Sequence, residues 1–420
     1  MKQTTNEIAL FSLFHHDIYF HDENKIDTNK LINLTDKKEN ISIKELGELL
    51  IKNIEQAVEG LNDSEISITL TGGMDSRVIL ACLLKLGIKP NCLTFGSPHS
   101  ADVVYAKQLA KSIGLNFHNT ASFPPDSTCY KKWVEKVIQL DNGNAHLHRA
   151  HRLAAIAEHA SEYQPKLLLI GHMGGEGLRG LGYNNYFSSR FFEEVNKKGK
   201  TIEDSFSSVL DEYFIRKENL DIKAIIEAIK KLPYMSEDHH KNEFYFLYDL
   251  IGNIHHQQDI RLYKKHIKNV HPVYLQENYL TALFSSKHHF LNNPSGILGK
   301  MNNPKVHSLL IRHIYPSLLN YPLSKGYKPS EYLKGLWYVV PKKIWRKYTS
   351  KKKYGSNFSY GKWYVDFVKE HSENISDEIW EHYDKEKYMH TLYKNKHETN
   401  EGYWHKFSNP IFFDLKNKLL

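Results

Sequence analysis

Short apolar runs alternate with helical segments between residues 66 and 170, and this alternation limits the fold more than any other feature of the sequence. The runs have the length and the apolar or β-branched content of buried strands, and they cover residues 66–71, 91–96, 115–119 and 166–170. Helical spacing is found between them, at residues 75–86, 101–113, 130–140 and 147–158. Strands that alternate with helices form a parallel sheet with helices on both faces. The sequence therefore predicts an α/β fold.

The flanking regions have weaker patterns. Ser42-x-x-Glu45 is a capping box ahead of apolar residues at helical spacing, whereas a short strand or two is expected around Ile8–Phe20. After about residue 190 the strand pattern fades, and helical spacing interrupted by prolines continues to the C-terminus. The predicted divisions are an N-terminal extension with a lead-in helix at 1–60, an α/β core at 61–190 and a mainly helical region at 191–420.

Composition excludes several classes of protein. The 420 residues are 41% hydrophobic and 25% charged, which is typical of a globular chain. No apolar run approaches the ~20 residues of a membrane-spanning helix, and the first 17 residues make a poor secretory signal. Three scattered cysteines, Cys82, Cys92 and Cys129, predict neither a disulfide framework nor a zinc site. We therefore expect a cytoplasmic protein with no membrane span.

The first strand leads into Leu70-Thr71-Gly72-Gly73-Met74-Asp75-Ser76, the most informative segment of the chain. In an open parallel sheet, ligands bind beyond the carboxyl ends of the strands. Two glycines there let backbone N–H groups approach an anion near a helix N-terminus, and Thr71 and Ser76 add hydroxyl donors. Asp75 suits a Mg²⁺ ion that bridges phosphates. The alternative is a strand–turn–helix junction in which Asp75 only caps the helix.

The segment Thr71-Gly-Gly-Met-Asp-Ser76 resembles the SGGxDS signature of the PP-loop ATP pyrophosphatases, which hold the pyrophosphate of ATP and cleave between its α- and β-phosphates. Within that superfamily, whose fold is of the adenine nucleotide α-hydrolase type, the chain is most similar to the synthetase domain of asparagine synthetase. Its relatives there are the β-lactam synthetases and the lasso-peptide cyclases. The resemblance covers roughly residues 40–330 and implies ATP and Mg²⁺ as cofactors. The nucleotide-binding residues that it implies in this loop are Leu70, Thr71, Gly72, Gly73, Asp75 and Ser76.

Two later segments match the family in the same order. Leu93-Thr-Phe-Gly96 resembles the strand beside the adenine, which implies that Phe95 and Gly96 contact the nucleotide. Residues 167–180 resemble the family's LLSGEGADELFGG stretch. This match implies that Glu176 is the second Mg²⁺ ligand beside Asp75, and that the nucleotide also contacts Gly171, His172 and Gly174.

A third match lies at residues 310–326, which resemble the family's late helix and R-x-K turn, although Leu323 replaces the arginine. It implies that Lys325 is the catalytic lysine that contacts the phosphates and the transition state. Arg179 stands where the family usually has an aromatic residue, which puts aspartate as the substrate in doubt. Arg77, just inside the helix after the glycine loop, is expected on a solvated face.

The resemblance implies an AMP-forming C–N ligase that adenylates a carboxylate and forms an amide with ammonia or a substrate amine. The full-length synthetases begin with a glutaminase domain whose nucleophile is an N-terminal cysteine, whereas Lys2 follows Met1 here. We therefore expect no glutaminase, and a separate amidotransferase or a carrier is the candidate protein partner. The expected acid is a small molecule, a peptide or a glycan precursor.

Other features leave alternatives open. A PP-loop tRNA-modifying enzyme would use the basic run Lys342–Lys353 to hold RNA, but no paired cysteines suggest thiolation and nucleic acid is not the expected partner. A nucleotide-binding partner protein without catalysis is the second alternative, since Glu176 replaces an aspartate. Among the 25 histidines, His148 and His151 could share one helix face and border a substrate pocket.

Overall fold

The computed structural model describes residues 4–14, 26–37, 39–120, 126–180, 189–195, 201–210, 212–235, 239–292, 304–349, 362–394, 404 and 406–420. Its centre is a five-stranded sheet in the order β3-β2-β1-β4-β5, with every neighbouring pair parallel. The strands are β1 (Ile66–Thr69), β2 (Asn91–Phe95), β3 (Phe117–Thr120), β4 (Leu167–Ile170) and β5 (Asn269–Pro272). The predicted parallel α/β fold is confirmed.

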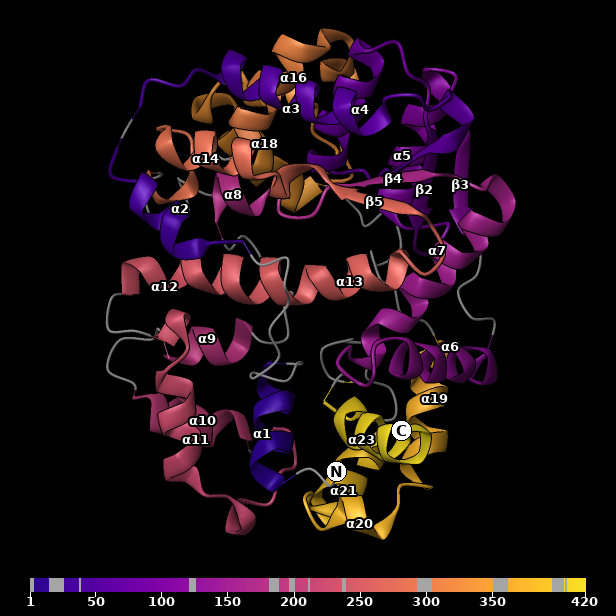
Figure 1. Cartoon of the computed structure of the whole chain (residues 1–420), viewed down its shortest axis with the longest axis vertical. Helices are drawn as coiled ribbons and strands as arrows, with labels where there is room; N and C mark the ends of the chain where they lie inside the picture. Colours follow the sequence, from indigo (N-terminus) through magenta and orange to yellow (C-terminus); the bar gives the residue numbers. More distant parts are fainter. Residues whose placement is uncertain are drawn as a thin grey trace.

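Helices cover both faces of this sheet because each crossover between parallel strands carries one. On one face α3 (Ile43–Val58), α4 (Asp75–Lys85) and α16 (Pro304–Ile314) pack together, above the sheet in Figure 1. On the other face α7 (Ala150–Tyr163) packs against β2 and β3. The predicted capping box is present at the start of α3, where Ser42 and Glu45 each bond the other's backbone N–H.

The sequence did not reveal one strand, and the expectation for the N-terminal residues is wrong. The fifth strand, β5, lies within the mainly helical C-terminal region, and it ends at Pro272, one of the prolines that interrupt the helical spacing there. Near the N-terminus, residues 5–14 form helix α1 (Thr5–Phe14) rather than a strand, and residues 15–20 of that expected strand lie outside the described residues. Seven consecutive residues of α1, Ile8 to Phe14, are buried, so the helix has no polar face that its sequence could reveal.

A long helical stretch crosses beneath the sheet (Figure 1). It consists of α12 (His239–Tyr245), a π-helical segment η5 (Phe246–His255) and α13 (His256–Tyr263). The lower half of the molecule is helical, as the sequence predicts for the C-terminal region. Its helices are α1, α6 (Ser127–Leu140), α9 (Ser189–Val195), α10 (Ile202–Leu210), α11 (Ile222–Lys230), α19 (Lys362–Ser372), α20 (Asp377–Trp380), α21 (Lys385–Lys394) and α23 (Ser408–Leu419).

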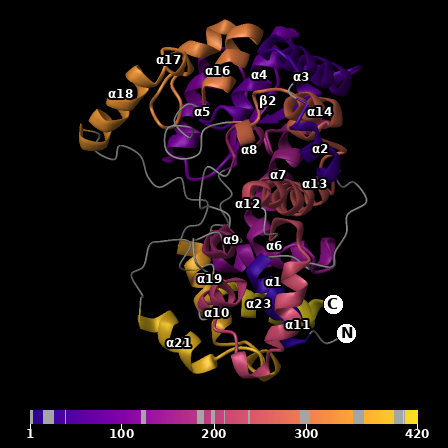
Figure 2. The same cartoon turned by 90° about the vertical axis from the view of Figure 1, so that its left-hand side faces the viewer.

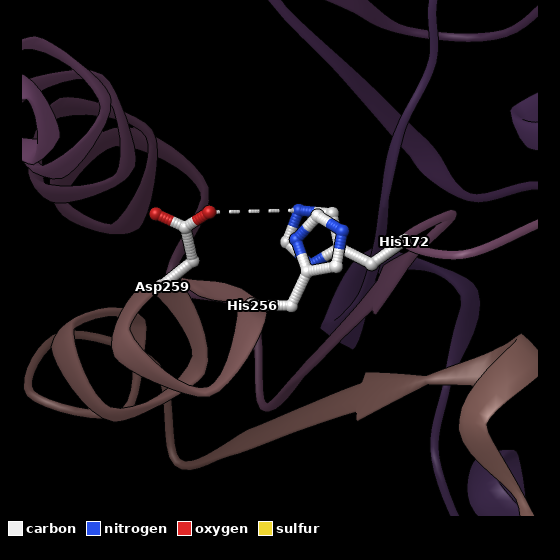
Figure 3. A group of neighbouring side chains, drawn as sticks. All are labelled: His172, His256 and Asp259. Carbon is white, nitrogen blue, oxygen red and sulfur yellow. Dashed lines mark ion pairs between the residues drawn. The ribbon is translucent and has the colours of Figure 1, made fainter. Parts of the chain in front are cut away.

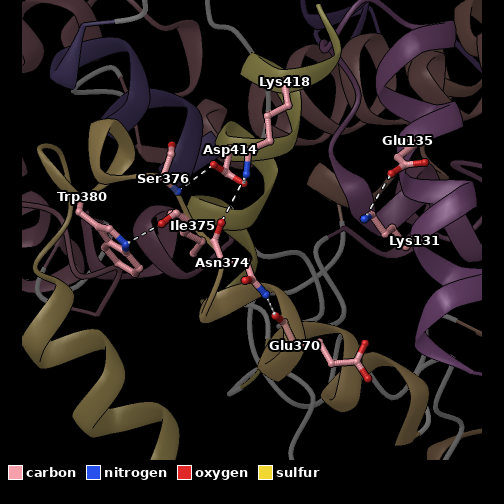
Figure 4. Close-up of polar contacts among 9 residues, drawn as sticks. All are labelled: Lys131, Glu135, Glu370, Asn374, Ile375, Ser376, Trp380, Asp414 and Lys418. Atoms are coloured by element: carbon pink, nitrogen blue, oxygen red, sulfur yellow. Dashed lines mark hydrogen bonds and ion pairs between the residues drawn. The ribbon is translucent and has the colours of Figure 1, made fainter.

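The last helix, α23, anchors the C-terminus in this lower half. It packs against α6 and α19. Asp414 accepts a hydrogen bond of 3.0 Å from the backbone N–H of Ser376 and pairs with Lys418 at 2.6 Å, as Figure 4 shows. The C-terminal residues are thereby fixed to the loop before α20.

The upper half is completed by α2 (Thr28–Leu34), α5 (Ala101–Ser112), α8 (Glu176–Arg179), α14 (Glu277–Ser285), α17 (Pro329–Tyr332) and α18 (Leu336–Thr349). Figure 2 shows α17 and α18 at the outer edge of this half, with α18 projecting from the body. Among the described residues, no helix is both long enough and apolar enough to cross a bilayer.

Candidate functional site

The loop between β1 and α4 is ordered by its own side chains. The Ser76 hydroxyl accepts a 3.1 Å hydrogen bond from the Thr71 N–H and lies 3.2 Å from the Thr71 hydroxyl. The Thr71 hydroxyl in turn accepts a 3.1 Å bond from the Gly73 N–H. These bonds fix the turn at the carboxyl end of β1, where a ligand binds in such sheets. Leu70 is fully buried beneath it and continues the pairing with β2 through Leu93.

A second loop, residues 321–325, lies directly against Gly72. The Ser324 N–H donates a 2.8 Å hydrogen bond to the Gly72 carbonyl. A Cβ atom on Gly72 would lie 2.7 Å from the Ser324 Cβ and 3.1 Å from Asp102 Oδ1, which is closer than side chains pack. Glycine is therefore required here by close approach. The loop that carries Lys325 reaches the glycine loop across some 250 residues of sequence.

Arg77 holds this second loop in place. Its guanidinium donates hydrogen bonds to the carbonyls of Tyr321 at 2.5 Å and Pro322 at 3.0 Å. The side chain is fully buried, so the expectation of a solvated face is wrong. Burial lowers the pKa of Arg77 to about 10, but the group stays charged at neutral pH. The positive charge of Arg77 therefore lies against the backbone of the loop formed by residues 321–325.

Asp102, in the first turn of α5, joins the two loops. Its carboxylate accepts hydrogen bonds from the Gly72 N–H and the Ser324 hydroxyl, and it interacts with the charge of Lys325. Burial nevertheless raises the pKa of Asp102. Lys325, Gly72 and Ser324 are therefore brought together around one carboxylate at the position where the resemblance implies phosphates.

Asp75, the first residue of α4, lies among groups from distant segments. The two carboxylate oxygens contact different groups: His307 Nε2 lies 2.7 Å from Oδ1, and Arg179 Nη2 lies 3.6 Å from Oδ2. Burial opposes ionisation, but Arg179 and His307 outweigh it and hold the pKa of the carboxyl below its usual value. The backbone carbonyl of Asp75 accepts a 2.8 Å bond from the Tyr274 hydroxyl.

The loop after β4 packs on this aspartate. A Cβ on Gly174 would lie 2.9 Å from the Cβ of Asp75 and 2.5 Å from the ring of Tyr274, so only glycine fits. Gly171 is equally near, since a Cβ there would lie 3.4 Å from the Ser76 nitrogen. Met173 between them adopts a left-handed conformation with φ of 64°. The two glycine-rich loops thus meet at the carboxyl edge of the sheet.

Glu176 and Asp75 lie near two buried tyrosines that interact with each other, Tyr248 and Tyr279. Burial raises the pKa of Tyr248, and the charge of Glu176 raises it further. Burial also raises the pKa of Tyr279, where the added charge is that of Asp75. Arg179 and His307 lie beside Asp75, and Arg179 follows Glu176 by one turn of α8.

Phe95 and Gly96 end β2, next to the glycine loop. Phe95 is half-buried, and Gly96 has φ of 126°, a conformation that favours glycine. The Gly96 carbonyl accepts a 3.2 Å bond from the Asn119 side chain on β3, which fixes the turn. Both residues therefore lie at the same edge of the sheet as Gly72 and Gly171.

A buried charged cluster begins one residue beyond Gly171 (Figure 3). His172 Nε2 lies 3.8 Å from Asp259 Oδ2 on α13, and the His172 ring stacks on His256 at 4.1 Å between centroids. The same carboxylate oxygen accepts bonds from two guanidiniums, Arg149 at 2.9 Å and Arg152 at 3.1 Å. Asp259 has no exposed side-chain area, whereas Arg152 is 37% exposed and gives the cluster an opening to solvent.

This cluster suits an anion better than a metal ion. His172, His256 and Asp259 have ligand atoms within 4.8 Å of one another. However, the two rings stack with 14° between their planes, so their lone pairs do not converge as they would on a shared ion. Asp259 and the two arginines already sum to a net charge of +1, because burial lowers the pKa of His172 to about 4 and that of His256 well below 6.5. A buried excess of positive charge favours a negative ligand.

Comparison with known protein families gives a match. The sequence profile of the asparagine synthase family matches residues 48–287, more than half of the chain. This chain belongs to the asparagine synthase family. Proteins of this family are, in general, ATP-using synthetases that form amides. No curated protein matches the chain.

The family's nucleotide fits the glycine loops of this asparagine synthase-family chain. The absence of a Cβ at Gly72 lets the loop that carries Lys325 approach, and the hydroxyls of Thr71 and Ser76 lie in the same turn. A Mg²⁺ ion commonly uses one or two carboxylates together with substrate phosphates. Asp75 fits that role because its side chain is 25% exposed and Oδ1 has no hydrogen-bond partner of good geometry.

The synthetase resemblance did not reveal several residues of this site. His307 and Asp259 give no local signal, because each meets its partner only through the packing of distant helices. Arg149 and Arg152 do carry one: they are spaced at i and i+3 and share a helix face with each other, as His148 and His151 do. His151 lies beside this cluster, where burial lowers its pKa and the charge of Asp259 opposes that shift.

Proposed function

We propose that the chain is an AMP-forming ligase that adenylates a carboxylate and then transfers the acyl group to ammonia or to a substrate amine. The observation that carries this proposal is the contact between the two loops at Gly72, which brings Lys325 beside a donor-rich turn at the carboxyl end of β1. A lysine on a separate loop is of use where negative charge develops during phosphoryl or acyl transfer.

In the first step, one oxygen of the substrate carboxylate attacks the α-phosphorus of ATP. The bond from that phosphorus to the bridging oxygen of the β-phosphate breaks, and pyrophosphate leaves with the electron pair. The backbone of Gly72 and Gly73 with the hydroxyl of Ser76 would hold the β- and γ-phosphates. The Gly72 N–H now donates a hydrogen bond to Asp102. When ATP binds, this bond would break and the N–H would donate to a phosphate oxygen instead.

The fixed turn orients the phosphates and requires little rearrangement in the transition state. Asp75, with Glu176 as the second carboxylate, would hold Mg²⁺, which neutralises phosphate charge when bound. The ion would replace Arg179, whose guanidinium now lies 3.6 Å from Asp75.

In the second step, the nitrogen nucleophile attacks the acyl carbon of the adenylate. The carbonyl oxygen becomes negative, and Lys325 is placed to stabilise it. AMP then leaves as the carbon–oxygen bond breaks, and the amide forms after the nitrogen loses a proton. We assign this transfer to the space between the loops that carry Gly72 and Gly174.

We also propose that the acid is held at the charged cluster described above. His172 is adjacent to Gly171, which lies against Ser76, so a bound acid would be close to the α-phosphate. Arg149 and Arg152 would bind the negatively charged group of the acid. The ring nitrogens of His256, which have no hydrogen-bond partner among the described residues, would donate or accept a hydrogen bond. The free oxygen of Asp259 would accept a bond from an amine or hydroxyl of the same substrate.

Pyrophosphate release from ATP, measured with panels of acids and amines, tests the reaction. We expect AMP and pyrophosphate in equal amounts, and a rate at least about a hundredfold lower for Asp75→Asn. Asp63→Asn is the matched control, because Asp63 is exposed and precedes β1 while Asp75 follows it. ADP and phosphate as products would rule out adenylation.

The two alternative functions give different results in the same assay. ATP binding without any turnover, unchanged by the choice of acid, would support a partner protein that has lost catalysis. Turnover that depends on added tRNA would support an RNA-modifying enzyme.

The double variant Arg149→Met with Arg152→Met tests the acid site separately from the nucleotide site. That double variant should raise KM for the acid and leave KM for ATP unchanged.

A further inference from the structure

Helix α18 exposes large apolar side chains to an unusual degree. Trp337 is 76% exposed, Trp345 64% and Ile344 54%. Apart from Leu420 at the C-terminus, no other large apolar side chain among the described residues is more than 39% exposed. Scattered exposed apolar residues are normal, but three on one helix form a patch that requires an explanation.

These residues lie on one face of the helix. Residues 337, 344 and 345 are spaced at i, i+7 and i+8, and Pro341, also exposed, lies between them at i+4. The opposite side packs on the body: Val339 is buried, and Lys342 pairs with Glu331 of α17. The apolar face therefore points away from the protein, and Figure 2 shows the helix at the outer edge of the molecule.

The sequence of this helix is strongly basic. Its residues 336–349 contain Lys342, Lys343, Arg346 and Lys347 and no acidic residue. An outward apolar face with tryptophans, together with lysine and arginine, is the pattern of helices that lie in the headgroup region of a membrane. Lysine and arginine also complement the charge of anionic lipids.

We propose that α18 is an interfacial helix that binds the surface of an anionic membrane. Trp337, Ile344 and Trp345 would enter the headgroup region, and the basic residues beside them would contact lipid phosphates. This binding is independent of the proposed ligase activity.

Nucleic acid fits this surface less well than a membrane. Proteins that hold single-stranded nucleic acid combine aromatic stacking platforms with cations in one groove. Here Pro341 and Ile344 occupy the outward face between the two tryptophans, and they offer neither a charge nor an aromatic ring to a base. The observations therefore favour lipid.

Flotation of the full chain with vesicles tests the proposal. We expect binding to vesicles of phosphatidylcholine with phosphatidylglycerol, little binding to phosphatidylcholine alone, and weaker binding as salt is added. Trp337→Ser with Trp345→Ser should lower the apparent affinity at least about tenfold. Ile222→Ser, at a position 38% exposed on α11, is the matched control and should bind like the natural chain.

Tryptophan fluorescence gives a second measurement on the unaltered protein. Trp363, Trp380 and Trp404 are at most 6% exposed and Trp133 is partly buried against the core, so brominated lipids should quench mainly Trp337 and Trp345. A charge variant, Lys343→Glu with Lys347→Glu, should lose binding and keep the same unfolding temperature. Equal binding by the tryptophan variant, no preference for phosphatidylglycerol, or binding to tRNA instead of vesicles would each overturn the proposal.

Discussion

Two aspartates near the carboxyl edge of the sheet differ in how deeply they are buried and in how closely arginines contact them. Asp259 has no exposed side-chain area, and two guanidiniums contact one of its oxygens at 2.9 and 3.1 Å. Asp75 is 25% exposed, and its nearest guanidinium lies at 3.6 Å. Both carboxyls have a lowered pKa, because positive neighbours outweigh burial in each case.

The difference indicates what each carboxylate can do. A buried aspartate in direct contact with two arginines offsets part of their charge, and removing it leaves both guanidiniums without that partner. An aspartate with a looser, partly exposed ion pair can exchange its cation for another. We therefore expect Asp259 to matter chiefly for stability and Asp75 chiefly for turnover.

The largest effect should come from Asp259→Asn. The variant leaves Arg149 and Arg152 with uncompensated charge, and we expect the free energy of unfolding to fall by about 3 kcal/mol or more. Urea denaturation measures this change, with Asp63→Asn as the exposed control. A loss below about 1 kcal/mol would show that Asp259 is not essential to the charged cluster.

A smaller effect is expected for Arg179→Gln. Without this cation, the pKa of Asp75 should rise toward its ordinary value, and Mg²⁺ should no longer compete with a guanidinium. The Mg²⁺ concentration for half-maximal pyrophosphate release should fall about tenfold. Arg312→Gln, at an exposed position on α16, is the control. A higher Mg²⁺ requirement would instead make Arg179 part of the nucleotide site.

The charged cluster should also make stability depend on pH. Burial lowers the pKa of His172 to about 4, from 6.5 in an unfolded chain, so unfolding takes up a proton between these values. Stability is therefore complete above pH 6.5 and declines as the pH falls toward 4. At pH 5.5 the share of His172 is about 1 kcal/mol. Urea denaturation of His172→Gln at pH 7 and 5.5 should show a decline smaller by that amount; an equal decline would contradict this assignment.

The smallest effect on stability is expected for Asp75→Asn, although the same change should lower the rate of turnover at least about a hundredfold. A partly exposed ion pair contributes about 1 kcal/mol or less to folding. The measurement is urea denaturation beside the Asp259→Asn variant. If the two variants lost equal stability, the contrast between the two aspartates would fail.

The sequence predicted the sheet but not all of its strands. Strands β1, β2 and β4 are short apolar runs whose pattern is local, and each was expected within two residues of its observed bounds. Strand β5 is Asn-Val-His-Pro, with only one strongly apolar side chain. It forms because the edge of β4 presents backbone N–H and C=O groups that need hydrogen-bond partners. The residue types at 269–272 do not reveal that they meet this need.

The same distinction applies to the site. The residues of the glycine loop were identifiable because their chemistry is fixed by a short segment and its spacing. The buried position of Arg77 was not, because its partners are carbonyl groups of residues 321 and 322, and any residue supplies a carbonyl. When a side chain binds the backbone of a distant segment, the sequence contains no partner residue type that would reveal the contact.

Strand β5 also has a consequence for how the chain is made. Strand β4 ends at Ile170 and its outer partner begins at Asn269, about 100 residues later. At a synthesis rate of about 5–20 residues per second, the apolar strand β4 waits roughly 5–20 s for that partner. During this interval its edge is open to pairing with another nascent chain. The order of strands in the sheet therefore leaves the edge of β4 open to aggregation midway through translation.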